Sequence, residues 1–170
     1  MSCNPGSGTV NCIRWAQINP YKDGGPSVIQ AGVLGTNGEY RSFPDLAVNA
    51  CGDMAIGYSK TSSSTFPSIY VAGREANDIA GALQPEIQLK AGEATYTAFD
   101  TPPHRWGDYS GMTIAPDGKT FYYAGEYSKN LATGTKWGTY IGSFEFPDCK
   151  IDADSCFTAK TNKGVVNFCL

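Results

Sequence analysis

Large and small side chains alternate with a period of two along several short stretches of this chain, which is the pattern of β-strands with one buried face. The clearest case follows a turn at 49–53, where Met54, Ile56 and Tyr58 are separated by small residues. Further strands are predicted at Val10–Ile18, Ser27–Leu34, Leu46–Val48, Ser68–Glu75, Glu86–Lys90, Met112–Ile114, Thr120–Tyr123 and Thr139–Glu145.

Turn-forming residues separate these stretches. The segment 19–26 is rich in Gly, Pro and Asn, so the first two strands are predicted to form a hairpin, after an irregular lead-in over residues 1–9. Ile79, Ala82 and Leu83 have helical spacing, but Gly81 and Pro85 interrupt it. We expect at most one turn of helix there.

The chain contains an internal repeat. Met112–Ile114 follows the similar Leu46–Val48 by 66 residues, and Gly118 follows Gly52 by the same number. Two consecutive strand units of this kind are typical of successive blades of a β-propeller. Other repeated features are Thr139–Glu145, 70 residues after Ile69–Glu75, and the leading arginines Arg41 and Arg105.

The repeat predicts an organisation for the whole chain. Residues 1–40 form the lead-in and N-terminal hairpin, 41–92 and 104–146 form two blade-like units of four strands each, and 147–170 form a cysteine-containing tail. Because a propeller closes with typically four to eight blades, we expect this chain to be part of a larger propeller or to assemble from several copies. The alternative is a small β-sandwich with two similar halves.

Composition supports an all-β chain. The 170 residues suit a single all-β region, and 41% of them are hydrophobic whereas only 17% are charged. The 20 Gly and 10 Pro, with 3 Trp, 10 Tyr and 8 Phe, argue against disorder and against a helical bundle. Antiparallel strands joined by many turns are therefore expected.

Charge and hydropathy exclude two classes of partner. The formal net charge is −3 and no run of Lys or Arg occurs, so nucleic acid is not an expected partner. No apolar run approaches the roughly 20 residues of a membrane span, and the first residues lack the basic and apolar regions of a signal peptide.

Six cysteines, none in a Cys-x-x-Cys pair, are expected to form disulfides rather than a zinc or redox site. Cys3 with Cys12 and Cys149 with Cys156 would close short loops, leaving Cys51 and Cys169 as a long-range pair, although six cysteines allow 15 pairings. Disulfides imply an oxidising, extracellular or cell-surface location, and the missing export signal then implies a processed, truncated or recombinant chain. The alternative is six reduced, buried thiols.

Four groups of residues form a recognisable set: Pro67–Glu75 with Asp78 and Gly81, Arg105–Ser110, Thr120–Tyr123 with Glu126-Tyr127, and Trp137–Phe144. Together they resemble the sialidase-like, Asp-box (BNR) type of β-propeller in the C-terminal part of bacterial exported proteins. The resemblance covers about Val28 to Phe146 and implies a propeller fold and an extracytoplasmic setting, without a particular activity. Asp117–Phe121 resembles a degenerate Asp-box turn with one residue too few between Asp117 and Thr120.

The resemblance raises the possibility of sialidase-type hydrolysis. This chemistry needs an arginine cluster that holds a carboxylate, a tyrosine nucleophile beside a glutamate, and an acid. Candidate groups exist, but neighbouring residues of a strand point to opposite faces, and the arginines and aspartates can instead tie adjacent strand units together. The candidates are Arg41, Arg74 and Arg105 for the cluster, and Tyr127, Glu126 and Asp108 for catalysis.

The stretch Arg105–Tyr109 is the main candidate ligand site. Trp106 and Tyr109 can stack on a sugar while Asp108 accepts hydrogen bonds from its hydroxyls. Alternatively, Arg105 pairs with Asp108 and Trp106 buries its ring. His104, the only histidine, follows two prolines and is predicted to be a loop residue.

No cofactor is expected, because the chain has no phosphate loop, dinucleotide fingerprint or nucleophile elbow. Asp152–Ser155 has the alternating oxygens of a calcium loop but lacks its glycine and its terminal glutamate. The sequence thus predicts a secreted or cell-surface propeller segment with a binding or structural role, directed at a glycan or a protein. The alternatives are a glycoside hydrolase of sialidase type and a self-assembling structural subunit, in which the open strand edges are covered by further copies.

Overall fold

The computed structural model describes residues 1–21, 23–97, 102, 104–132 and 134–150, together with the strands at 156–161 and 164–169; residues 134, 135 and both of these strands are described by their backbone alone. Every regular element in these ranges is a β-strand and every strand pair is antiparallel. The predicted all-β class is therefore confirmed. Within this part of the chain, the sheets do not close into a barrel or a complete propeller.

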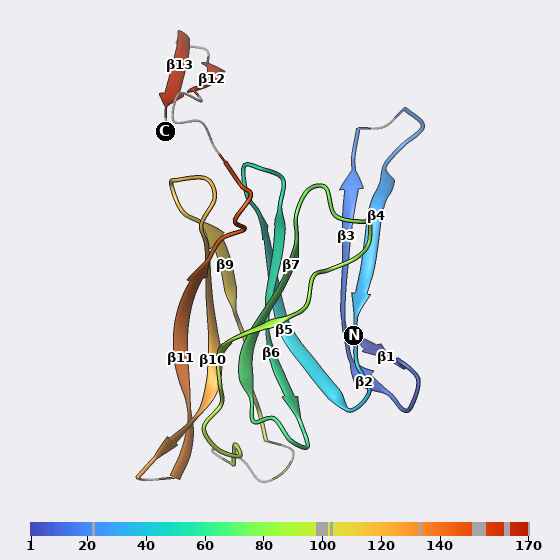
Figure 1. Ribbon diagram of the computed structural model, residues 1–170, viewed down its shortest axis with the longest axis vertical. Helices are drawn as coiled ribbons and strands as arrows, with labels where there is room; N and C mark the ends of the chain where they lie inside the picture. Colours follow the sequence, from blue (N-terminus) through green and yellow to red (C-terminus); the bar gives the residue numbers. More distant parts are fainter. Residues whose placement is uncertain are drawn as a thin grey trace.

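Three sheets stack face to face (Figure 1). The hairpin of β3 (Ile13–Asn19) and β4 (Ser27–Leu34) lies on the right, the four-stranded sheet β5–β8 in the centre and the three-stranded sheet β9–β11 on the left. The two larger sheets consist of β5 (Glu39–Val48), β6 (Met54–Ser62), β7 (Ser68–Arg74) and β8 (Ile87–Lys90), and of β9 (Gly111–Ile114), β10 (Phe121–Leu131) and β11 (Gly134–Phe144).

Two short hairpins complete the list of strands. β1 (Ser2–Cys3) pairs with β2 (Val10–Asn11), and β12 (Cys156–Thr161) pairs with β13 (Gly164–Cys169). The unit predicted over 41–92 contains four strands, whereas the unit over 104–146 contains three among the residues described. The segment with helical spacing forms a turn in which the Ala82 N–H donates to the Ile79 carbonyl at 3.1 Å.

The central sheet is buried on both faces, which is why β6 has seven consecutive buried residues. Its larger side chains, among them Ile56 and Tyr58, pack against Trp15 of the hairpin. On the opposite face Tyr123 of β10 lies against Gly57 and near Ile69, because the small residues of β6 leave room for its ring. The large and small residues that alternate along β6 therefore pack on two different layers, the large ones against the hairpin and the small ones against the β9–β11 sheet.

The repeat in the sequence corresponds to a repeat in register. Val48 pairs with Met54, and Ile114 pairs with Phe121, so the second strand of the later sheet is offset by 67 residues rather than 66. Gly52 and Gly118 both adopt positive φ, 85° and 74°, and each N–H closes its turn at 3.0 Å.

This register preserves the direction of stacking. Ile56 lies on the face of β6 that meets the hairpin. The equivalent residue of β10 is Tyr123, which lies on the face that meets the central sheet. Each of the two larger sheets thus turns the same face toward the preceding layer.

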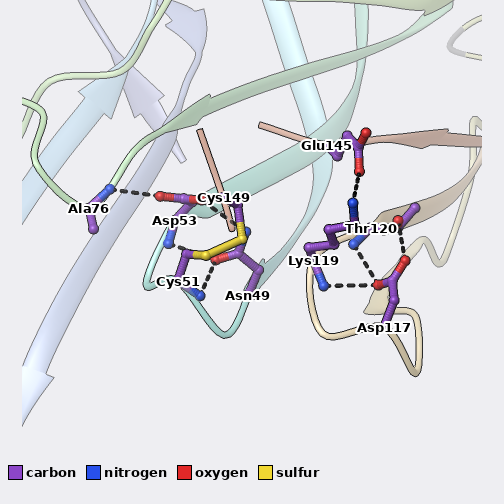
Figure 2. Close-up of a disulfide and its surroundings, with 9 residues drawn as sticks. All are labelled: Asn49, Cys51, Asp53, Ala76, Asp117, Lys119, Thr120, Glu145 and Cys149. Atoms are coloured by element: carbon purple, nitrogen blue, oxygen red, sulfur yellow. Dashed lines mark hydrogen bonds and ion pairs between the residues drawn. A yellow bond between two sulfur atoms is a disulfide. The ribbon is translucent and has the colours of Figure 1, made fainter. Parts of the chain in front are cut away.

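Two disulfides are present. Cys3 and Cys12 are joined as predicted, with their Cα atoms 5.9 Å apart. The predicted pairs Cys149–Cys156 and Cys51–Cys169 are wrong, because Cys51 is bonded to Cys149 across a Cα distance of 5.6 Å (Figure 2). The alternative of reduced thiols is excluded for these four residues. The two remaining cysteines occupy paired backbone positions in β12 and β13.

The Cys51–Cys149 pairing depends on tertiary structure that sequence spacing does not reveal. Chain folding brings the segment after β11 beside the turn between β5 and β6, where Cys149 is buried. The Asn49 side chain orders this turn by accepting hydrogen bonds from the N–H groups of Cys51 and Asp53, at 3.0 and 2.9 Å. The Ala50 N–H then donates to the Gly118 carbonyl at 2.8 Å, which joins the two equivalent turns.

Candidate ligand-binding site

A pocket with a cavity volume of about 610 Å³ is found where β5 begins and β6 ends. Aromatic side chains from four segments line it: Tyr40 of β5, Phe66 between β6 and β7, Tyr96 after β8, and Trp106 before β9. Most of its other lining residues carry hydroxyl groups, including Ser42, Ser59, Thr61, Thr65 and Thr95.

Ring contacts fix the part of the wall formed by Tyr96, His104 and Trp106. Tyr96 meets Trp106 edge to face, with centroids 4.9 Å apart and planes at 85°. His104 contacts the same tyrosine edge to face at 6.4 Å. The Trp106 indole N–H donates to the Ser59 hydroxyl at 3.4 Å, so the tryptophan is held against the central sheet.

A bulge in β5 anchors the segment that leads from this wall into β9. The register of β5 shifts between Ser42 and Asp45, and Phe43 takes a positive φ of 52°, which a non-glycine residue adopts only when its surroundings impose it. The Phe43 carbonyl accepts a hydrogen bond from the Ser110 hydroxyl at 2.7 Å, and the Asp45 carboxylate accepts one from the Met112 N–H, also at 2.7 Å. The bulge therefore positions the pocket wall.

The His104 side chain, which lines the pocket, carries a buried polar atom without a partner among the residues described. Nδ1 of His104 is buried and has no hydrogen-bond partner among the residues described. Buried polar atoms are nearly always hydrogen-bonded, so this nitrogen is an exception within the pocket wall. His104 thus lies in the candidate site, although the sequence predicted only a loop position.

The pocket presents no uncompensated charge. Lys60 is its one lining residue with a permanent charge among those described, and its ammonium binds the carboxylates of Glu39 and Glu86 instead. The Lys60 ammonium also lies 4.0 Å from the centre of the Tyr70 ring. The arrangement suits a neutral ligand with both apolar surface and hydroxyl groups.

A buried ion-pair network lies beside the pocket. Nη2 of Arg41 donates to Glu86 at 2.9 Å and to Glu39 at 2.5 Å, and the Tyr58 hydroxyl donates to Glu86 at 2.6 Å. Burial of the Glu86 carboxyl raises its pKa, but hydrogen bonds from Lys60, Tyr58 and Arg41 outweigh burial and hold the pKa below its ordinary value.

This network accounts for Arg41, which was predicted as a ligand-binding residue. Its side chain is only 1% exposed, and its pKa is raised because the hydrogen bond and charge of Glu86, with those of its other neighbours, outweigh the lowering effect of burial. The network ties the start of β5 to the segment before β8, within one strand unit rather than between two.

The three candidate arginines do not form a cluster. Arg41 pairs with Lys60 at one end of the central sheet, whereas Arg74 pairs with Met54 at the other. Six strand residues separate these ends, roughly 20 Å at strand spacing. Arg74 is buried and donates to the Asp78 carbonyl at 2.6 Å. Arg105 forms the predicted pair with Asp108 at 3.2 Å, with both side chains well exposed.

Two of the three catalytic candidates, Glu126 and Tyr127, fall on opposite faces of β10. Tyr127 is buried toward the central sheet, with the Lys90 ammonium 4.5 Å from its ring centre, whereas Glu126 belongs to the opposite face. Burial and then the nearby charge of Asp108 raise the pKa of Glu126. The structure therefore brings Glu126 close to Asp108 and separates it from Tyr127. Tyr109 is 89% exposed and does not line the pocket.

The segment 117–121 forms a turn, as expected from its sequence. The Asp117 carboxylate accepts hydrogen bonds from the N–H groups of Lys119 and Thr120, both at 2.9 Å, and from the Thr120 hydroxyl at 2.6 Å (Figure 2). These bonds lower the pKa of Asp117, the hydroxyl of Thr120 most. The turn is structural and lies at the opposite end of the sheets from the pocket, beside the Cys51–Cys149 bond.

One cluster among the described residues has the spacing of a metal site. The ligand atoms of Cys51, Asp53 and Cys149 lie within 4.8 Å of one another, but the two sulfurs are bonded to each other. Asp53 is occupied by hydrogen bonds from Asn49 and from the Ala76 N–H, each at 2.9 Å. This cluster is therefore a cross-link rather than a metal centre. The calcium-like stretch 152–155 lies outside the described residues.

Sequence reasoning identified Trp106 but missed Tyr40, Phe66, Tyr96 and the hydroxyl-bearing residues opposite them. The Ser/Thr-rich link at 61–65 followed by Phe66 was the available signal, because hydroxyls beside an exposed aromatic residue are typical of a polar binding surface. Tyr40 could not be identified from the sequence, because its position beside the pocket depends on how the strands pair.

Comparisons with known proteins add no family to this description. No family model matches the chain, no curated protein is similar to it in sequence and no solved structure matches it. None of the elements in the described ranges is a helix able to cross a membrane. What the chain does must therefore be inferred from its own geometry.

Proposed function

We propose that this chain is a propeller-type binding module of the extracytoplasmic space and that it binds a neutral glycan in the pocket beside Trp106. The observation that carries the proposal is the composition of that pocket: aromatic walls, many hydroxyl groups and no free charge.

This composition matches the surface of a sugar. A pyranose ring has apolar C–H faces that pack on aromatic rings, and hydroxyls around its edge that need hydrogen-bond partners. Trp106 and Phe66 supply ring surface, while Ser59 and Thr61 supply hydroxyl groups.

The absence of free charge among the described lining residues indicates the class of ligand. An acidic sugar carries a carboxylate, and a site that holds one generally offers an arginine in paired hydrogen-bond geometry. Here Lys60 is already bound to two carboxylates, and Arg41 lies within the same network. A neutral hexose or N-acetylhexosamine is therefore favoured over a sialic acid.

Two features support the remaining parts of the proposal. The repeated register and the constant stacking direction of the two larger sheets are those expected of propeller blades. The two disulfides fit an oxidising compartment outside the cytoplasm.

A glycoside hydrolase is the second candidate, and one observation favours it. Glu126, whose pKa is raised by burial, lies near the charge of Asp108, and a pair of carboxyl groups supplies the acid and base of most glycosidases. The sialidase variant of this idea has less support, because Arg41 and Arg74 lie at opposite ends of one sheet.

A glycan array that carries both neutral and sialylated oligosaccharides tests the proposal, followed by calorimetric titration of each bound glycan. We expect neutral glycans to bind and Trp106→Ala to weaken that binding at least tenfold, because the substitution removes one aromatic wall. Tyr109→Ala is the matched control, since it removes an exposed ring only three residues along the chain that does not line the pocket.

Three outcomes would contradict the proposal. Binding confined to sialylated glycans, equal binding by wild type and Trp106→Ala, or no binding to any neutral glycan would each exclude the pocket as a neutral-sugar site. Release of sugar from a bound glycan, abolished by Glu126→Gln, would instead favour the hydrolase.

A further inference from the structure

The outer face of the β9–β11 sheet exposes large apolar side chains. Tyr122, Trp137 and Ile141 are 42%, 45% and 65% exposed and lie on the side of the sheet away from the central sheet. One charged residue, Glu126, belongs to the same face of β10. An exposed apolar sheet face of this kind usually marks an interaction surface.

The same positions of the central sheet are covered. Tyr122 corresponds to Ala55 at the offset of 67 residues, and Ile141 corresponds to Val71 at the offset of 70. Ala55 and Val71 are 0% and 4% exposed, because the β9–β11 sheet packs on that face. The outer face of β9–β11 thus corresponds to a face of the central sheet that a further sheet covers, but none of the described residues forms a sheet that covers the outer face of β9–β11.

The other end of the stack is also open. The outer face of the β3–β4 hairpin carries Ile18, Val28 and Val33, which are 57%, 62% and 54% exposed. Arg14, which pairs with Val33 in register, is its charged residue. The two open faces therefore combine apolar strips with charges of opposite sign.

We propose that two copies of this chain associate head to tail, with the outer face of each β9–β11 sheet covering the outer face of the partner's β3–β4 hairpin. In this arrangement Glu126 faces Arg14 of the partner subunit. The contact extends the stacking already present within the chain, in which each layer covers the face left open by the one before it.

Head-to-tail contacts generate a closed ring when their rotation closes and an open filament when it does not. Each chain supplies three stacked layers, so two copies supply six, which lies within the four to eight blades of known propellers. Three copies would supply nine and fall outside that range. The stoichiometry that the stacking supports is therefore a dimer.

Sedimentation equilibrium of the oxidised chain tests this arrangement. The chain mass is 18.2 kDa, so we expect a species of twice that mass at micromolar concentration. Ile141→Asp and Val33→Asp, one on each open face, should each give monomers because a buried, unpaired carboxylate disfavours the contact. Tyr21→Asp changes a 92% exposed residue in the β3–β4 turn and should leave the dimer intact.

Mixing the two single variants distinguishes head-to-tail association from face-to-face pairing. In the mixture, the unaltered β9–β11 face of the Val33→Asp chain can meet the unaltered hairpin of the Ile141→Asp chain. A heterodimer held by this one contact should therefore reappear, weaker than the wild-type dimer because its second contact carries both substitutions. A wild-type monomer at all concentrations, a mass that grows without limit, sensitivity to only one of the two substitutions, or failure of the mixture to associate would each overturn the proposal. Circular dichroism of each variant confirms that its monomer is folded.

Discussion

Glu86 is expected to be the most important single carboxylate for stability. Its oxygens accept hydrogen bonds from Arg41, Tyr58 and Lys60, whose side chains are almost fully buried. In Glu86→Ala the guanidinium and the ammonium would share only Glu39. Removal of one partner from a buried ion pair costs roughly 3–5 kcal/mol.

The lower end of that range applies here, because the Glu86 side chain is 21% exposed and Glu39 remains in place. We expect a loss of about 3 kcal/mol, which for a chain of this length corresponds to a fall in Tm of roughly 6–12 °C. The assay is chemical denaturation followed by circular dichroism. Glu145→Ala is the matched control: it breaks an exposed pair with Lys119 and should cost less than about 1 kcal/mol.

The pH dependence gives a second test of the same residue. Because the pKa of Glu86 is lower in the folded chain than its ordinary value of 4.5, its stabilising contribution is fully present above pH 4.5 and is lost as the pH falls through the folded pKa. The difference between wild type and Glu86→Ala should therefore be constant from pH 8 to about 5 and shrink below 4.5. A difference below about 1 kcal/mol at pH 7, or one that grows in acid, would refute the reasoning.

Two further predictions concern packing and cross-linking. The methyl group added in Gly57→Ala would overlap the Tyr123 ring, so we expect this variant to be destabilised by about 2 kcal/mol. Gly111→Ala has open space at its Cβ position and should change the free energy of unfolding by less than about 0.5 kcal/mol. Equal effects of the two substitutions in denaturant titration would contradict the packing described. The Cys51–Cys149 bond closes a loop with a sequence separation of 98. Replacing both cysteines by serine should therefore lower the free energy of unfolding by roughly 4–5 kcal/mol in the chain-entropy account. Unchanged stability under matched oxidising conditions would argue against the bond.

Much of the fold could be predicted from the sequence, because strand periodicity and turn residues are local signals. The hairpin around the 19–26 turn and the strands on either side of Gly52 and Gly118 have the predicted order. The 66-residue repeat also indicated that two sheets share one plan. The repeat did not reveal that the second strands of the two sheets are offset by 67 residues rather than 66. This extra residue preserves the stacking direction, and it can be seen only from which residues pair across the two turns.

The candidate site was less predictable, because its residues come together only in three dimensions. Trp106 stood out by its chemistry, but Tyr40 and Phe66 belong to strand ends that the sequence does not place side by side. The arginines misled for the same reason: similar positions in a repeat suggested a shared cluster, while the strand pairing separates Arg41 from Arg74. The Cys51–Cys149 bond is likewise a long-range contact, which residue spacing cannot select from 15 pairings.

The three tryptophans offer the most direct test of the central claim, that the pocket beside Trp106 binds a neutral sugar. Trp15 lies in the core, Trp106 lines the pocket and Trp137 lies on the outer face of β9–β11. Each gives one indole N–H signal in a ¹⁵N-labelled spectrum, and titration with neutral hexose and N-acetylhexosamine oligosaccharides should shift the Trp106 signal while Trp15 and Trp137 stay in place. Movement of Trp137 instead, or no movement of Trp106 at millimolar sugar, would contradict the assignment.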